Sequence, residues 1–176
     1  MAPKNPLGYR YLLTWKQANQ IFELTEKFVT TLPAKNPKTG QDLSDLIDHM
    51  LRSGRSIVRN IEEGYRRIRT EQYIDFLGFS AGSNEELLHD IEYCIKNNLG
   101  SQELARKILY LCKGEGKMLH NQVKGLDNKM LNGKTISQNE MAGRHLKDNQ
   151  NREQKFDQWL DDVKNNPNTL NNPPKF

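Results

Sequence analysis

The sequence predicts an all-α fold, an antiparallel up-down-up-down four-helix bundle followed by a C-terminal tail that contains one short amphipathic helix. Three observations support this prediction. Four long stretches repeat apolar residues at steps of three and four, the spacing of a helix with one buried face. The connections between these stretches are short, which favours antiparallel neighbours. No stretch shows the alternating pattern of a half-buried strand.

Length and composition favour a single domain with an appendage. A chain of 176 residues is long enough for one core, but hydrophobic residues make up only 35%, which is low for a compact globule. The formal net charge of +4 is compatible with a nucleic-acid partner, although many inert domains share it. Neither a signal peptide nor a run of about 18 apolar residues occurs, so we expect a soluble cytoplasmic protein without a membrane partner.

The first helix is expected to open the bundle, which we place at residues 14–131. Residues 1–13 contain prolines and a glycine and are interpreted as an N-terminal arm. Thr14 is a good N-cap residue, and Gln17 three positions later would complete a capping box. The apolar repeat then continues to about Leu32, where a proline-containing loop follows.

Three further helices are expected after this loop. Their approximate limits are residues 41–69, 70–99 and 101–131, separated by a polar turn and by a Leu-Gly break. Gly114 and Gly116 weaken the middle of the last helix, because glycine has a low helix propensity.

The composition changes after the fourth helix. Residues 132–176 contain nine Asn and three Pro, with seven basic and six acidic residues that nearly cancel. This polar suffix is not core, but residues 153–164 form one amphipathic helical pattern. Its apolar residues are expected to dock on the protein's own bundle, on a neighbouring subunit or on another protein. They are Phe156, Trp159, Leu160 and Val163.

A row of arginines in the second predicted helix is the candidate binding surface. Four of them fall within an arc of about 60° and extend over about 21 Å of helix, and two more follow near its end. The guanidinium group presents a fixed fork of donors that suits phosphates. The candidate nucleic-acid-binding residues are Arg52, Arg55, Arg59, Arg66, Arg67 and Arg69.

An equally weighted interpretation gives these arginines no role in nucleic-acid binding. They would form a solvated face, or pair with acidic residues within the helix or across a subunit contact. The acidic residues considered are Asp45, Asp48, Glu62 and Glu63.

No residue set indicates catalysis. Glu86-x-x-His89 resembles half of a di-metal site in some four-helix bundles, but that site needs a second such pair and two further glutamates. Cys94 and Cys112 lack metal-ligand spacing and are expected as buried reduced thiols. We therefore predict a protein that is not an enzyme and has no catalytic residue, metal or cofactor.

Small residues inside the predicted helices indicate close packing. Gly54, Gly64, Ala81, Gly82 and Ser83 lie within helical patterns, where each glycine costs up to about 1 kcal/mol relative to alanine. Close approach of helices, within the bundle or between subunits, would offset that cost. A kink is the alternative explanation.

The runs IVRNIEEGYRR and TEQYIDFLGFSAGSNEELLHDIEY, with Trp15-Lys16-Gln17-Ala18 near the start, resemble a known family of four-helix bundles. That family includes proteins encoded within intervening sequences of large-subunit ribosomal RNA and the accessory variability proteins of diversity-generating retroelements. The resemblance covers roughly residues 10–125. It implies a ring-like homopentamer with a basic surface and, in the retroelement branch, binding to a reverse transcriptase and nucleic acid.

The predicted function is accordingly that of a non-enzymatic, oligomeric accessory protein that binds RNA or DNA and assists a reverse transcriptase or a similar enzyme. The alternative is a protein-interaction scaffold without a nucleic-acid role. The polar suffix has no counterpart in the short members of the family that the chain resembles.

Overall fold

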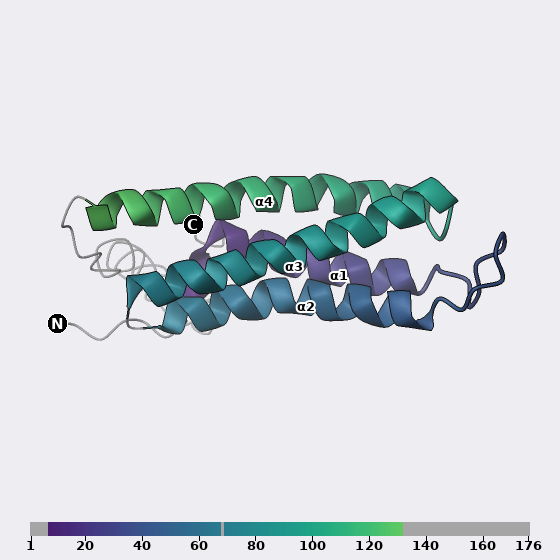
Figure 1. The fold of residues 1–176 in the computed structure, drawn as a ribbon, viewed down its shortest axis with the longest axis horizontal. Helices are drawn as coiled ribbons and strands as arrows, with labels where there is room; N and C mark the ends of the chain where they lie inside the picture. Colours follow the sequence, from purple (N-terminus) through teal and green to yellow (C-terminus); the bar gives the residue numbers. More distant parts are fainter. Residues whose placement is uncertain (1–6, 68, 132–176) are drawn as a thin grey trace, which may run out of the picture. The chain divides into compact units, whose positions relative to one another are not determined.

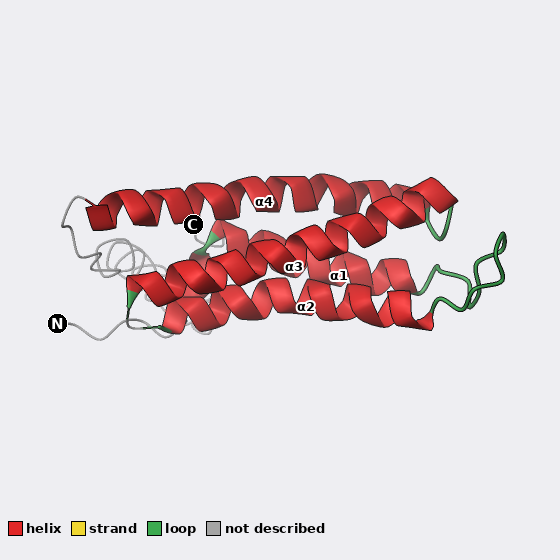
Figure 2. Cartoon of the chain, viewed as in Figure 1, coloured by secondary structure: helices red, strands yellow, loops and turns green. Residues whose placement is uncertain are grey.

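The computed structural model describes residues 7–67 and 69–131, all of which lie in one compact unit, Pro6–Ile136. This part of the chain consists of helices and loops and contains no strand (Figure 2). The predicted all-α fold with four long helices is confirmed. The helices are η1 (Gly8–Tyr11), α1 (Leu13–Val29), α2 (Ser44–Arg66), α3 (Thr70–Asn97) and α4 (Gln102–Leu131).

The four α-helices pack around a common core. α1 and α3 each contact both α2 and α4, so each helix has two principal neighbours. In Figure 1, the α1–α2 and α3–α4 connections lie at one end of the bundle and the α2–α3 connection lies at the other. The core is apolar, and its largest fully buried side chains include Ile21, Phe28, Met50, Ile57, Ile61, Leu77, Leu87, Ile91, Ile108 and Leu119.

None of the helices in residues 7–67 and 69–131 combines the length and the apolar character that a membrane crossing requires.

The start of α1 differs from the prediction. Thr14 is not an N-cap, because α1 already begins at Leu13 and the Thr14 hydroxyl donates to the Gln122 side chain of α4 at 3.1 Å. The Gln17 amide donates to the Leu111 carbonyl, also on α4, at 2.8 Å. The predicted capping box is therefore wrong. Both polar side chains hold α1 to α4 instead of capping their own helix.

The connection between α1 and α2 is longer than predicted because it is hydrogen-bonded to itself. α1 ends at Val29, and α2 begins only at Ser44. The backbone amide of Leu43 donates to the Ala34 carbonyl at 3.0 Å, and the Asp42 carboxylate accepts from the Ser44 amide at 2.8 Å. Residues 41–43 thus belong to the loop, although the prediction placed them in the second helix.

The break between α3 and α4 lies where it was predicted. Asn98 adopts a left-handed conformation with φ of 56°, and the Leu99 amide donates to the Cys94 carbonyl at 2.9 Å. Ser101 then precedes α4, and its hydroxyl accepts from the Leu104 amide at 3.4 Å. α4 continues through both of its central glycines without interruption.

Part of the segment predicted as an N-terminal arm is packed against the bundle. η1 places Tyr9 at 3% exposure, with its ring edge-on to Trp15 and Tyr65 at centroid distances of 5.5 and 6.2 Å. These three aromatic side chains connect η1 to the start of α1 and the end of α2.

Two helical glycines allow close contacts inside the bundle, as predicted. A Cβ atom on Gly64 would lie 2.6 Å from the Phe76 Cβ atom, and one on Gly54 would lie 3.2 Å from the Phe22 ring. Gly82 differs, since a Cβ atom there would meet nothing within 4 Å. Close packing within the bundle therefore explains Gly54 and Gly64 but not Gly82.

We predict opposite effects for alanine at two of these glycines. Gly64→Ala forces the α2 and α3 backbones apart and should lower the free energy of unfolding by about 1–3 kcal/mol. Gly82→Ala adds a methyl group to open space and should raise it by about 0.5–1 kcal/mol. Urea unfolding followed by circular dichroism measures both. Equal effects of the two substitutions would contradict this account of the α2–α3 contact.

Candidate functional site

The exposed side of α2 is determined by its buried side. Met50, Ile57 and Ile61 are completely excluded from solvent. Because a helix turns about 100° per residue, residues half a turn away from them must face outward. Four arginines occupy that outer side, and all four are exposed. We refer to Arg52, Arg55, Arg59 and Arg66 as the arginine stripe.

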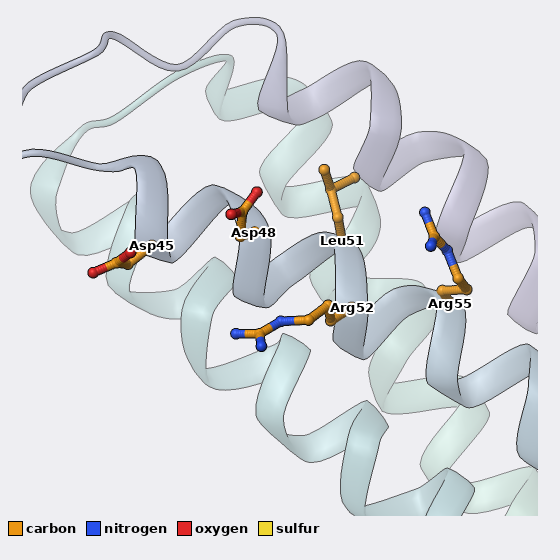
Figure 3. A pocket seen from close by; sticks show the side chains of 5 residues that line it. All are labelled: Asp45, Asp48, Leu51, Arg52 and Arg55. Carbon is orange, nitrogen blue, oxygen red and sulfur yellow. The ribbon is translucent and has the colours of Figure 1, made fainter.

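The N-terminal part of the arginine stripe borders a shallow surface depression. Its lining residues are Asp45, Asp48, Leu51, Arg52 and Arg55. Figure 3 shows Arg52 extending back toward the first turns of α2, whereas Arg55 points toward the neighbouring α1 helix. The Arg55 guanidinium carbon lies 5.8 Å from the centre of the Phe22 ring on α1, a cation–π distance. Acidic side chains thus mark one end of the stripe.

The C-terminal part of the arginine stripe contains one arginine held by an aromatic ring. The Arg66 guanidinium carbon lies 5.3 Å from the centre of the Tyr9 ring, and its Nη2 atom donates to the Tyr9 hydroxyl at 3.4 Å. Arg59 is exposed between these two parts of the stripe. None of the four arginines of the stripe forms an ion pair with an acidic residue that the structure describes.

Arg67 and Arg69 lie outside the stripe and are engaged differently. Arg67 forms an ion pair with Glu63 one helical turn earlier, and its guanidinium carbon lies 4.7 Å from the centre of the Phe76 ring. Arg69 lies 3.7 Å from the Glu71 carboxylate. The predicted pairing with acidic residues is therefore correct for Arg67. Within the described residues, the arginine stripe forms no such pair and is exposed, which agrees with a solvated face, and pairing across a subunit contact stays a prediction.

A ladder of polar contacts joins the outer edges of α2 and α3. In the sequence, small and charged side chains recur every three or four residues beside the buried face of α2. This recurrence is the pattern from which the ladder could have been predicted. The contacts are His49 Nδ1 to Asp90 Oδ2 at 2.6 Å, Ser53 to Glu86 at 3.3 Å, and Ser83 to Ser56 at 2.9 Å.

The Glu86-x-x-His89 pair faces away from the core. Both residues are exposed, and Glu86 accepts the Ser53 hydroxyl proton in the polar ladder. A di-metal site needs inward-facing ligands. Over residues 7–67 and 69–131, no group of three or more His, Cys, Asp or Glu side chains is arranged to hold a metal ion.

The outer side of α3 carries an exposed aromatic side chain that the sequence analysis did not single out. Phe79 is 59% exposed and stands edge-on to Phe76 at a centroid distance of 5.7 Å. Gly78 and Gly82 lie beside it, and a Cβ atom on either would meet nothing within 4 Å. The surface beside the Phe79 ring is therefore open, with no side chain of the described residues covering the two glycines.

The two cysteines are buried free thiols, as predicted. Burial raises the pKa of Cys94 to about 12, with a smaller contribution from Asp90. Burial also raises the pKa of Cys112 to about 12, with smaller contributions from Glu115 and Glu85. Because the thiolate is the reactive form, neither cysteine is suited to act as a nucleophile.

The residues predicted to dock the suffix lie outside the described part of the chain. These are Phe156, Trp159, Leu160 and Val163 in the helix expected at residues 153–164. Their docking role stays a prediction.

The chain matches a known protein family over most of its described residues. The family described as 23S rRNA-intervening sequence protein matches residues 10–121, which include α1, α2, α3 and most of α4. The matched region contains the complete arginine stripe. No curated protein matches the chain.

The contacts of the stripe predict that its arginines contribute unequally to stability. Arg66→Ala removes a guanidinium group from the Tyr9 ring and should lower the free energy of unfolding by about 0.5–1 kcal/mol. Arg59→Ala removes an exposed side chain and should change it by less than about 0.5 kcal/mol. Thermal and urea unfolding of the two variants provide the comparison. A larger loss for Arg59→Ala would contradict the contacts described above.

Proposed function

The chain belongs to the 23S rRNA-intervening sequence protein family, and on this premise we propose that it is a non-enzymatic accessory protein that binds RNA through its arginine stripe. The observation that carries the proposal is the exposure of four arginines along one side of α2 without an acidic partner among the described residues. Arginine pairs with phosphate through two parallel hydrogen bonds, and such contacts supply most of the sequence-independent affinity for nucleic acids.

The surroundings of the stripe favour a phosphate contact along its middle and C-terminal parts. The acidic residues interleaved there are already engaged. Glu63 pairs with Arg67, and Glu62 accepts a hydrogen bond from the Trp15 indole at 2.9 Å. At the other end, Asp45 and Asp48 would repel a phosphate backbone. We therefore propose that RNA follows α2 from Arg55 toward Arg66.

Assembly would strengthen this binding. We propose that the protein forms a homopentamer in which the arginine stripe of each subunit repeats around a ring. The resemblance to the ring-forming family supports this proposal, and repeated weak sites raise the total affinity for one long ligand. DNA is the competing nucleic acid. A reverse transcriptase or a similar nucleic-acid enzyme is the proposed protein partner.

The exposed side of α3 favours a second candidate function, that of a protein-interaction scaffold. Phe79 with its two open neighbouring glycines would accept a helix of another subunit or of a different protein. Under this alternative, α3 and not the arginine stripe would carry the function, and nucleic acid would have no part in it.

The RNA proposal predicts a change in salt dependence when charge is removed from the stripe. A variant with Arg55→Gln, Arg59→Gln and Arg66→Gln should bind single-stranded RNA more weakly. The slope of log K against log salt concentration should become shallower by roughly 2–3 units, because about 0.7–0.9 unit accompanies each phosphate contact. Fluorescence anisotropy over a salt series, with RNA and DNA of the same sequence, measures this change.

A matched variant controls for net charge. Arg106→Gln, Lys107→Gln and Lys117→Gln remove the same charge from exposed positions on α4, which is not a principal neighbour of α2. This control should retain the slope of the unmodified protein. If both variants lost the same slope, binding would depend on net charge alone, and the arginine stripe would not be the site.

The scaffold alternative makes a separate prediction about assembly. Phe79→Ser removes the exposed ring of α3 and should lower the assembled mass if that side packs against another subunit. Tyr110→Ser on α4, where the ring is 78% exposed, provides the matched loss of an aromatic side chain. Light scattering after size-exclusion chromatography gives the masses. An unchanged mass for Phe79→Ser would exclude the α3 side as a subunit contact.

A further inference from the structure

A carboxyl group without a partner lies in the middle of the core. Glu115 on α4 is 0% exposed, and neither of its carboxylate oxygens has a hydrogen-bond partner. Asn84 on the facing helix α3 is 1% exposed, and its Oδ1 atom also lacks a partner. Buried acceptors without donors are costly. The RNA proposal does not use either of these residues.

The helix backbone around Glu115 is adapted to polar neighbours. Gly114 and Gly116 flank the glutamate on both sides. A Cβ atom on Gly114 would lie 2.9 Å from the Gln17 Nε2 atom of α1, and one on Gly116 would lie 3.5 Å from the Asn84 Nδ2 atom of α3. The two glycines therefore let side-chain amides from both neighbouring helices approach α4 closely.

These two amides bind the backbone of α4 one turn before Glu115. Gln17 donates to the Leu111 carbonyl at 2.8 Å, and Asn84 donates to the Cys112 carbonyl at 3.0 Å. Both side-chain amides therefore donate to backbone carbonyl groups of α4. The carboxyl group accepts from neither of them, although it lies in the same layer of the core.

The charges near Glu115 do not compensate for its burial. The titratable groups beside it are Cys112 on α4 and Glu85 on α3, both of which ionise to anions. On α1 the facing polar group is the Gln17 amide, which does not titrate. No Lys, Arg or His in the described part of the chain pairs with Glu115. A proton on the carboxyl group is the remaining way to neutralise it, and burial accordingly raises the pKa of Glu115 to about 8.

We propose that Glu115 is a proton-controlled latch that keeps the C-terminal half of α4 closed when neutral and releases it when ionised. The helix is weakest at this point, because the two glycines lower its propensity on either side of the glutamate. The half that follows, residues 117–131, buries leucine side chains in the core and also contacts both neighbouring helices through Gln122. Its side chain accepts from Thr14 of α1 at 3.1 Å and donates to Tyr73 of α3 at 2.6 Å. Opening would break both contacts.

The direction of the pH effect follows from the two protonation states. In an opened helix, the solvated carboxyl group returns to its ordinary pKa of 4.5, whereas in the closed helix the pKa is about 8. Between these values the closed form holds one proton more than the open form. Raising the pH over this range therefore favours opening, by up to about tenfold for each pH unit, and the effect levels off above pH 8.

Amide hydrogen exchange tests the latch in the complete chain. Protection factors of residues 117–131 should fall by up to about tenfold per pH unit between pH 5.5 and 7.5. In Glu115→Gln, which stays neutral, they should be independent of pH. Amides in the middle of α2 should keep their protection in both proteins. Equal pH dependence in both proteins would overturn the proposal. So would a parallel loss of protection in α2, because global unfolding would then explain it.

A direct titration decides the matter if the glutamine variant does not fold. Carbon-detected NMR of the Glu115 carboxyl group in the unmodified protein reports its protonation without any substitution. A midpoint well above the ordinary value of 4.5, with residues 117–131 of the same protein losing protection over the same pH range, supports the latch, and a midpoint near 4.5 overturns it.

Discussion

Burial of one face of α2 is the constraint on which the arrangement of the candidate surface depends. Met50, Ile57 and Ile61 are fully excluded from solvent, and Gly64 brings α2 so close to α3 that a single added carbon would collide with Phe76. Because these contacts fix the rotation of α2 about its axis, the arginine stripe must lie on the solvent-facing side of the helix. A change of that rotation would bury guanidinium groups and expose the core, and both changes are costly.

Much of the fold could be predicted because it depends on repeating patterns of apolar residues. Four such patterns specify four helices, and the αL residue and glycine after α3 mark its end. Helix boundaries were less predictable where polar side chains choose between local and distant partners. Thr14 and Gln17 have the types and spacing of a capping box, yet both bind α4, about a hundred residues away in the sequence. A local pattern contains no information about that competition.

For the candidate site, the position of the arginine stripe could be predicted from the sequence, but its contacts with other helices could not. A helical wheel places the four arginines of the stripe on one side, because the angle between residues is a property of the helix alone. It does not show which arginines have further contacts. Arg66 meets a ring from η1 and Arg55 meets a ring from α1, so these contacts depend on how distant segments pack. The Arg67–Glu63 pair is different, since both partners lie one turn apart on the same helix.

At Glu115, the helical period predicts burial of a side chain that is not apolar. It occupies the same side of α4 as Ile108, Cys112 and Leu119, all of which are fully buried, so the helical period alone places a carboxyl group in the core. An apolar side chain there would pack without the cost of a missing hydrogen bond, whereas the carboxyl group makes the stability of α4 depend on a proton. α2 packs chiefly against α1 and α3. The end of α4 reaches α2 only indirectly, because Gln122 donates to Tyr73 of α3 and the Tyr73 ring packs edge-on against Tyr65 of α2.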